Sequence, residues 1–115
     1  MSTQPIQYLF VVWAPDYPDG LPRRLEVRAK HLEGMKAHVE SGGLVLGGAM
    51  VDEDSLLPSV TAKKMEGSVM IFKAARLEEV KSIIESDIYW TSNVWDKENL
   101  QIKPFLAAGQ PTILQ

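Results

Sequence analysis

The chain has 115 residues, of which 45% are hydrophobic and 23% are charged, so its composition excludes a disordered segment or a collagen-like fibre and fits one globular domain. Twelve basic and fifteen acidic residues give a formal charge of −3, and no basic cluster exceeds two residues, which argues against nucleic acid as a partner. Because the chain contains no cysteine, disulfides, thiolate zinc sites and cysteine nucleophiles are excluded.

The first half of the chain predicts a strand, a helix and a second strand. Residues 6–14 are β-branched and aromatic and lie between two prolines, which indicates a strand buried on both faces. Residues 21–41 have the apolar spacing of a helix, and Gly42–Gly43 supplies the positive φ with which helices commonly end. Residues 44–51 predict a strand in which Gly47–Gly48 indicates a bulge or a close approach to the backbone.

The second half predicts a strand, a helix and a last strand, at residues 67–74, 76–87 and 100–106. Residues 52–64 are polar and predict a loop, whereas the aromatic residues 89–95 have no clear periodicity. Pro104 cannot donate a ladder hydrogen bond, so it predicts that the last strand lies at an edge of the sheet or contains a bulge.

The predicted order β-α-β-β-α-β is that of a ferredoxin-like α+β fold, a four-stranded antiparallel sheet with two helices on one face. We expect this single domain to span residues 1–107, with residues 108–115 as a C-terminal tail. The first and third strands carry apolar residues on both faces, and two helices cover only one face. We therefore expect a homodimer in which a second copy covers the other face, sheet against sheet.

Charged residues occupy apolar faces of both predicted helices. A helical wheel of the first helix gives an inward stripe made of Leu21, Leu25, Leu32, Met35 and Val39. Arg28 falls near the middle of that stripe and His31 on its flank, with Arg24 and His38 further round the same side. In the second helix Asp87 falls within the inward stripe. Because an unpaired charge in such a place is costly, these residues are expected to be paired or to line a cavity.

His31 and Asp87 are the strongest candidates for catalysis. We expect the two helices to run roughly parallel, because each follows one of two parallel central strands, so both residues lie at a similar depth. A carboxylate that contacts an imidazole fixes its tautomer and favours a general base. Arg28 lies one turn from His31 and has the geometry to bind an anionic substrate group. The alternative is structural: a satisfied histidine beside an Arg28–Asp87 pair that joins the helices.

Further candidates are Ser68 and Tyr89, which we assign as lining residues of the substrate site, although a serine at a strand start and an aromatic beside a helix end are also ordinary structural features. His31 and His38 are seven residues apart and have no carboxylate at ligand spacing between them. We therefore expect no metal site.

The same residues resemble the YCII-related proteins, a family of the dimeric α+β barrel superfamily. The resemblance runs from about Tyr8 to Phe105 and rests on five short segments: Arg28 to Leu32, Gly43 to Gly48, Gly67-Ser68, Asp87-Ile88-Tyr89 and Ile102 to Phe105. It implies a ferredoxin-like fold that dimerises through its sheets and an active site formed by a histidine and an aspartate, which correspond to His31 and Asp87. Ile88 replaces the family's proline, which would stiffen the turn that directs Asp87.

Together these features predict a small cofactor-independent enzyme that transfers a proton on a cyclic or aromatic-derived organic acid, in a lyase or isomerase type of reaction. The alternative is a non-catalytic dimer that binds a small molecule or has a structural role. A monooxygenase of the same superfamily has no distinctive residue in its favour. The apolar stretches are shorter than the roughly 18 residues of a spanning helix, and no secretory signal is recognisable, so we expect a cytoplasmic protein that does not bind membranes.

Overall fold

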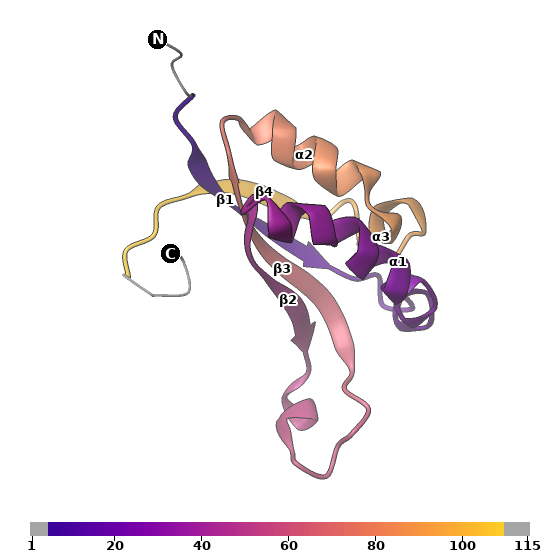
Figure 1. Cartoon of the computed structure of the whole chain (residues 1–115). Helices are drawn as coiled ribbons and strands as arrows, with labels where there is room; N and C mark the ends of the chain where they lie inside the picture. Colours follow the sequence, from indigo (N-terminus) through magenta and orange to yellow (C-terminus); the bar gives the residue numbers. More distant parts are fainter. Residues whose placement is uncertain (1–4, 110–115) are drawn as a thin grey trace.

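A computed structural model describes residues 5–109, which form one antiparallel sheet with the α-helices on one of its faces (Figure 1). The strands are arranged in the order β2-β3-β1-β4. The elements are β1 (Tyr8–Pro15), α1 (Leu21–Glu40), β2 (Leu44–Val51), the 3-10 helix η1 (Glu53–Leu56), β3 (Met65–Ala74), α2 (Leu77–Ser86), α3 (Ile88–Thr91) and β4 (Gln101–Phe105). This arrangement confirms the predicted ferredoxin-like α+β fold.

The core lies between the sheet and the helices and follows from the alternation of side chains along the two central strands. Phe10, Val12 and Ala14 of β1 are buried on the helix-covered face, beside Met70 and Phe72 of β3. Helices α2 and α3 add Val80, Ile84 and Tyr89, and Trp95, which follows α3, is also fully buried. Full burial of each large apolar side chain contributes about 1.5–3 kcal/mol, so this layer is the main source of stability.

The side chains that alternate with these core residues along β1 and β3 point to the opposite face of the sheet. Val11 and Trp13 of β1 and Val69 and Ile71 of β3 point to that face, where Trp13 is half exposed. The prediction that the strands are apolar on both faces is therefore confirmed, and within residues 5–109 no helix covers this second face.

Three local features differ from the sequence prediction. The stretch 89–95 begins with a short helix, α3, because the side chain of Asp87 caps its N-terminus by accepting a hydrogen bond from the Tyr89 amide. The predicted loop 52–64 contains η1, which Asp52 caps in the same way. Strand β3 begins two residues earlier than predicted, at Met65, which pairs with Val51.

Other local predictions are confirmed. Gly42 ends α1 with a φ of +80°, a conformation that a side chain would strain. Strand β4, which contains Pro104, pairs only with β1 and so forms an edge of the sheet. Most of the predicted tail, residues 110–115, lies outside the described residues, and the domain boundary at residue 107 stays a prediction. Between residues 5 and 109 the structure contains no helix that is long and apolar enough to span a membrane.

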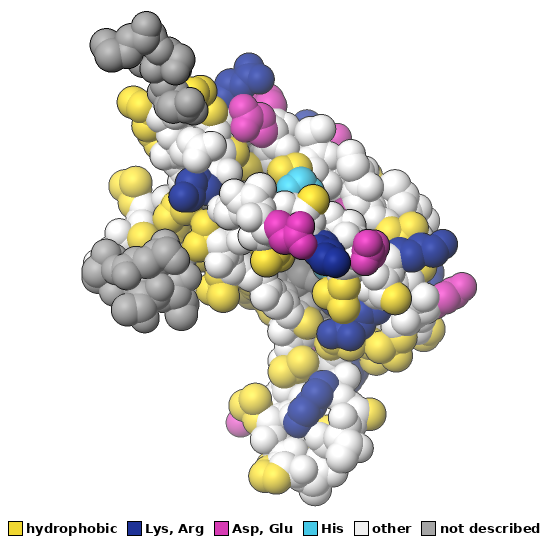
Figure 2. All heavy atoms as spheres, in the orientation of Figure 1, with side chains coloured by type: hydrophobic (Ala, Val, Ile, Leu, Met, Phe, Trp, Pro, Cys, Tyr) yellow, Lys and Arg dark blue, Asp and Glu magenta, His cyan; other side chains and the backbone are white. Residues whose placement is uncertain are grey.

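The β2–β3 hairpin extends well beyond the rest of the fold, and its far end carries hydrophobic side chains at the surface (Figures 1 and 2). Leu56 and Leu57 lie there and are exposed. The tip is ordered by the buried Ser55, whose hydroxyl donates to Asp52 at 2.6 Å and accepts from the Lys64 amide at 2.9 Å. None of the residues 52–64 lines the cavity described below.

Candidate active site

A cavity of about 310 Å³ lies between α1 and strands β2 and β3. Its polar wall is formed by Arg24, Arg28, His31, Ser68 and Tyr89. The remaining wall is apolar, with Leu32, Met35, Val39, Leu44 and Met70, or nearly bare backbone. A volume of this size suits a small organic molecule.

The cavity exists because small residues face α1 from β2. Gly47, Gly48 and Ala49 line it, and Gly47 and Ala49 pair with Met70 and Ser68, whose side chains are buried on the helix-covered face. A Cβ atom added to Gly47 would contact Leu44 and Met70 in the cavity wall. Gly48 pairs with Val69, so the open space around it lies on the uncovered face of the sheet. The register irregularities of β2 flank the two glycines, between Leu44 and Leu46 and between Met50 and Val51.

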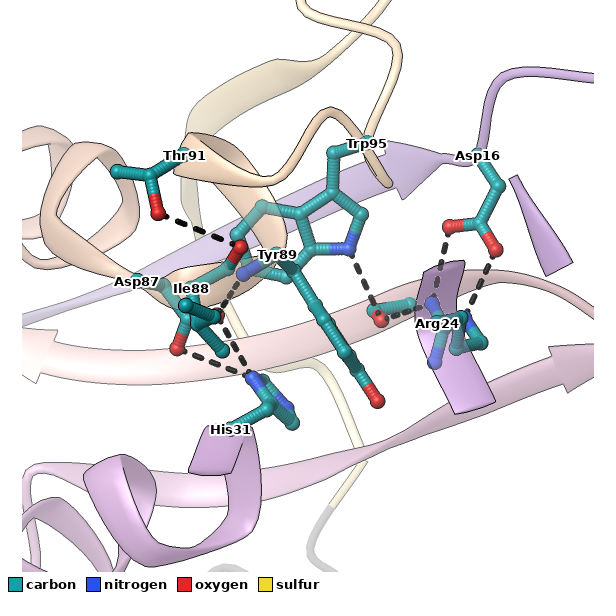
Figure 3. Close-up of polar contacts among 9 residues, drawn as sticks. Asp16, Arg24, His31, Asp87, Ile88, Tyr89, Thr91 and Trp95 are labelled. Atoms are coloured by element: carbon teal, nitrogen blue, oxygen red, sulfur yellow. Dashed lines mark hydrogen bonds and ion pairs between the residues drawn. The ribbon is translucent and has the colours of Figure 1, made fainter. Parts of the chain in front are cut away.

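His31 and Asp87 meet beside this cavity (Figure 3). His31 Nδ1 lies 2.8 Å from Asp87 Oδ2 and 3.0 Å from Oδ1. The side chain of Asp87 is 4% exposed and that of His31 is 12% exposed. Because an ionised carboxylate only accepts hydrogen bonds, Nδ1 carries the proton and donates it, which leaves Nε2 as the basic nitrogen of the neutral ring.

The position of Asp87 follows from the junction of two helices. Asp87 ends α2 and is the N-cap of α3, where Oδ2 accepts the Tyr89 amide at 2.8 Å. Ile88 occupies the first position of α3, a position that also tolerates proline. The carboxylate is thus oriented by two hydrogen-bond donors, His31 and Tyr89, without the family's proline.

The route by which the two residues meet differs from the predicted one. The central strands β1 and β3 are antiparallel, so the helices that follow them run in opposite directions, and the prediction of parallel helices was wrong. Asp87 reaches His31 because α3 packs against α1, which the aperiodic stretch 89–95 did not reveal.

Tyr89 lies between His31 and Arg24 (Figure 3). The imidazole stacks on its ring at 3.8 Å between centroids, with 11° between the planes, and the guanidinium carbon of Arg24 lies 4.6 Å from the same centroid. Trp95 packs edge-on against Tyr89 at 5.5 Å. Burial raises the pKa of the Tyr89 hydroxyl, against the opposing effects of Arg24 and Arg28.

The predicted inward face of α1 is rotated relative to the face that is buried in the structure. Leu25, Leu32 and Val39 of the predicted inward stripe are about half exposed, while Arg24 is 2% exposed. Arg28, in the middle of that stripe, is exposed and lines the cavity. Leu32 and Val39 face the cavity instead of packed core, and an apolar pattern alone does not distinguish the two.

Arg24 is the site residue that sequence analysis left without a role. Its Nε and Nη2 donate to the two oxygens of Asp16 at 2.8 and 3.0 Å, and Nη2 also donates to Ser68 Oγ at 2.7 Å. Ser68 accepts a further hydrogen bond from Trp95 Nε1 at 3.2 Å. The position of Asp16 could have indicated this contact, because Asp16 directly follows β1 and lies eight residues before an arginine of the predicted helix.

A second, more open groove of about 430 Å³ lies between α1 and α2, on the other side of Asp87. Lys30, His38 and Ser82 line it, but His31 does not. The predicted site residues other than Asp87 all line the smaller cavity, which is therefore the candidate active site. Residues 5–109 contain no cluster of three or more histidine and carboxylate side chains able to hold a metal ion.

Known proteins resemble this chain in sequence over most of its length. The family model of the YCII-related domain matches residues 8–106. The chain belongs to the YCII-related family. Its YCII-related relatives include fusaric acid biosynthesis protein 2 of Gibberella fujikuroi, which is 34% identical over 105 residues that cover 91% of this chain and 97% of the relative. Protein YciI of Escherichia coli O6:H1 is 33% identical over 97 residues, covering 84% and 95% of the two chains.

A solved structure shares the fold of this YCII-related chain. It is a 5-chloro-2-hydroxyhydroquinone dehydrochlorinase from Burkholderia phenoliruptrix in complex with 2,5-dihydroxybenzoquinone. The two align with a TM-score of 0.72 over 85% of this chain and 93% of the other, at 22% sequence identity. At that identity the likeness establishes the fold.

Proposed function

We propose that this protein is a small-molecule enzyme in which His31 transfers a proton on a cyclic or aromatic-derived organic acid. The observation that carries the proposal is the contact of His31 Nδ1 with Asp87 at 2.8 Å beside a cavity of about 310 Å³. The fold neighbour, a dehydrochlorinase with a dihydroxybenzoquinone ligand, and the relative named for fusaric acid biosynthesis support a reaction on a small organic molecule.

The chemistry assigned to each residue is simple. His31 Nε2 accepts a proton from the substrate, and Asp87 stabilises the imidazolium that forms. In an elimination, the electron pair left by that proton expels a leaving group such as chloride from the adjoining part of the substrate. In an isomerisation, His31 returns the proton to another carbon. Arg28 attracts the anionic substrate at the cavity mouth, and Ser68 and Tyr89 contribute polar groups to its wall.

The test is proton exchange in D₂O. Hydroxybenzoates, cyclic keto acids and chlorinated hydroquinones are incubated with the protein, and ¹H NMR follows the loss of each C–H signal while a chloride electrode follows elimination. We expect at least one compound to react about 100-fold faster with the wild-type protein than with His31→Gln. His38→Gln, on the groove side of α1, is the matched control and is expected to keep the wild-type rate. Equal rates for His31→Gln and wild type on every compound would reject the proposal.

A second measurement isolates the role of Asp87. With ¹⁵N-labelled histidine, we expect neutral His31 to carry its proton on Nδ1 in the wild-type protein, because the carboxylate accepts from that nitrogen. Asp87→Asn is expected to return His31 toward the ordinary mixture of tautomers. An unchanged tautomer in this variant would mean that Asp87 does not orient the ring.

We further propose that the protein acts as a homodimer joined through the uncovered sheet face. The support is the apolar character of that face, where Val11, Val69 and Ile71 surround the half-exposed Trp13. Light scattering after size exclusion tests it: Trp13→Glu is expected to give monomers. Leu25→Glu places the same charge on exposed α1 and is expected to leave dimers. A wild-type monomer at micromolar concentration would contradict the proposal.

A further inference from the structure

The side chain of Arg24 is held more firmly than any other cation at the cavity. It is 2% exposed, and its Nε and Nη2 atoms make the two parallel hydrogen bonds to Asp16 that fix the plane of a guanidinium. Ser68 accepts a third bond from Nη2. These contacts use only Nε and Nη2, so the third nitrogen of the guanidinium remains available.

That remaining nitrogen, Nη1, faces the cavity. Nη1 donates no hydrogen bond within residues 5–109, yet among those residues no fully buried polar side-chain atom lacks a partner. Nη1 therefore has accessible surface, and since Arg24 lines the cavity, that surface lies in the cavity wall. The same reasoning applies to the hydroxyl of Tyr89, which also lines the cavity and has no hydrogen-bond partner among the described residues.

The charge around these two donors favours an anion. Of the described residues that line the cavity, none is a carboxylate, whereas Arg24 and Arg28 are both cationic. Asp16 neutralises Arg24 overall, but its oxygens are engaged by Nε and Nη2 and do not line the cavity. Arg28 forms no ion pair within residues 5–109, so the charge on the described cavity wall itself is positive, whereas the two balancing carboxylates, Asp16 and Asp87, lie behind that wall.

The position of Tyr89 sets the geometry. The His31 ring centre and the Arg24 guanidinium carbon lie 3.8 and 4.6 Å from the centre of the Tyr89 ring, and the ring lies between them (Figure 3). A molecule that contacts both residues must therefore extend across the Tyr89 ring. A substrate whose acidic group binds Arg24 and whose reacting atom lies at His31 must therefore be about as wide as one aromatic ring.

We propose that Arg24 Nη1 and the Tyr89 hydroxyl form the inner subsite for the carboxylate of an aromatic acid, with the ring of that acid extending toward His31. Asp16 and Ser68 are positioning residues that hold the guanidinium, and Arg28 guides the anion at the more exposed mouth. This inference rests on the proposed function in one respect, namely that this cavity is the substrate site. It assigns the inner end to Arg24, which sequence analysis had left without a function.

Two probes of nearly equal shape test the subsite in the wild-type protein. Isothermal titration compares 4-hydroxybenzoate with 4-hydroxybenzamide, which replaces the carboxylate by a neutral amide. We expect the carboxylate to bind about tenfold more tightly or better, because charge-assisted hydrogen bonds are lost in the amide. Equal affinities, or no binding of 4-hydroxybenzoate at millimolar concentration, would overturn the inference.

A double variant separates Arg24 from Arg28. Asp16→Asn combined with Arg24→Gln removes the guanidinium without leaving a buried carboxylate unpaired, and circular dichroism establishes that it folds. We expect it to lose about tenfold in affinity for 4-hydroxybenzoate, and the matched control Arg28→Gln to lose about threefold or less. The reverse order would place the anion at the mouth and overturn the assignment.

A measurement without substitutions covers the case in which the double variant does not fold. In wild-type protein with ¹⁵N-labelled arginine, 4-hydroxybenzoate is expected to shift the Arg24 side-chain signals more than those of Arg28. Larger shifts at Arg28 would overturn the inference. His31→Gln is expected to keep carboxylate binding, so failure of the subsite and failure of proton transfer at His31 give different results.

Discussion

Two residues of α1 each form a buried pair with a carboxylate, and the two pairs differ in the chemistry that they permit. Arg24 contacts Asp16, and His31 contacts Asp87, each at 2.8 Å and each with a carboxylate side chain that is 4% exposed. The guanidinium is always charged and makes two parallel bonds, so it supplies a permanent charge. The imidazole uses one nitrogen for Asp87 and keeps the other for the proton transfer proposed above. We call the Arg24 side of the cavity its fixed end and the His31 side its reactive end; Tyr89 lies between them.

The largest difference between the pairs is expected in stability. Arg24→Met leaves the Asp16 carboxylate buried without its partner, and we expect a loss of about 3–5 kcal/mol in the free energy of unfolding measured with urea. Adding Asp16→Leu, which removes the orphaned charge, is expected to restore most of that loss. A single-variant loss below about 1 kcal/mol would show that water reaches the pair and compensates it.

Ser68→Ala tests how far the fixed end depends on its third contact. The substitution removes the acceptor of the Arg24 Nη2 and Trp95 Nε1 hydrogen bonds, and an unsatisfied buried donor is expected to cost about 1–3 kcal/mol. Ser86→Ala is the control, because Ser86 is exposed and bonds only to its own helix; we expect a change within about 0.5 kcal/mol. Equal effects would remove Ser68 from the positioning network.

His31→Gln is expected to have a smaller effect than loss of Arg24, about 1 kcal/mol in the same urea measurement. Asp87 keeps its hydrogen bond from the Tyr89 amide, so the carboxylate is not left without a donor. A loss as large as that of Arg24→Met would mean that the reactive end is as much a structural tie as the fixed end. That result would favour the non-catalytic alternative.

Tyr89→Phe sharpens the comparison through pH. Because burial raises the pKa of Tyr89 above the ordinary value of about 10, the unfolded chain releases this proton first as pH rises. The wild-type protein is therefore expected to keep this contribution below pH 10 and to lose it above, a loss that Tyr89→Phe lacks. Urea unfolding at pH 8 and pH 11 measures it, with the exposed Tyr8→Phe as control. Identical pH dependence in wild type and Tyr89→Phe would show that the hydroxyl is effectively in water.

Much of the fold was predictable because its signals are local. Alternation along residues 6–14 predicted a strand with two apolar faces, and the glycine that ends α1 predicted its own positive φ. The short α3 was not predicted, because four residues have too little periodicity to identify a helix. Its N-cap, Asp87, was instead assigned to the preceding helix, whose spacing continues up to that residue.

Of the two buried pairs at the site, the sequence predicted the contact of His31 with Asp87 and missed that of Arg24 with Asp16. A charged residue among apolar ones marks a position that needs a partner, and this was enough to select His31 and Asp87. The partner of Arg24 was missed because Asp16 lies in a proline-rich loop, where a carboxylate is ordinarily exposed. The predicted orientation of α1 was wrong because apolar residues that line a cavity have the same spacing as those that fill a core.

The sequence by itself determined the strands, the long helices and the presence of charges that require partners, since each depends on neighbours within a few residues; the α+β class followed from the order of these elements. Only the tertiary structure decided that Asp16 meets Arg24, that α3 brings Asp87 to His31, that Tyr89 lies between Arg24 and His31, and that small residues in β2 leave a cavity beneath α1. The physical reason is distance along the chain: His31 and Asp87 are 56 residues apart, and the packing of α3 against α1 brings them into contact.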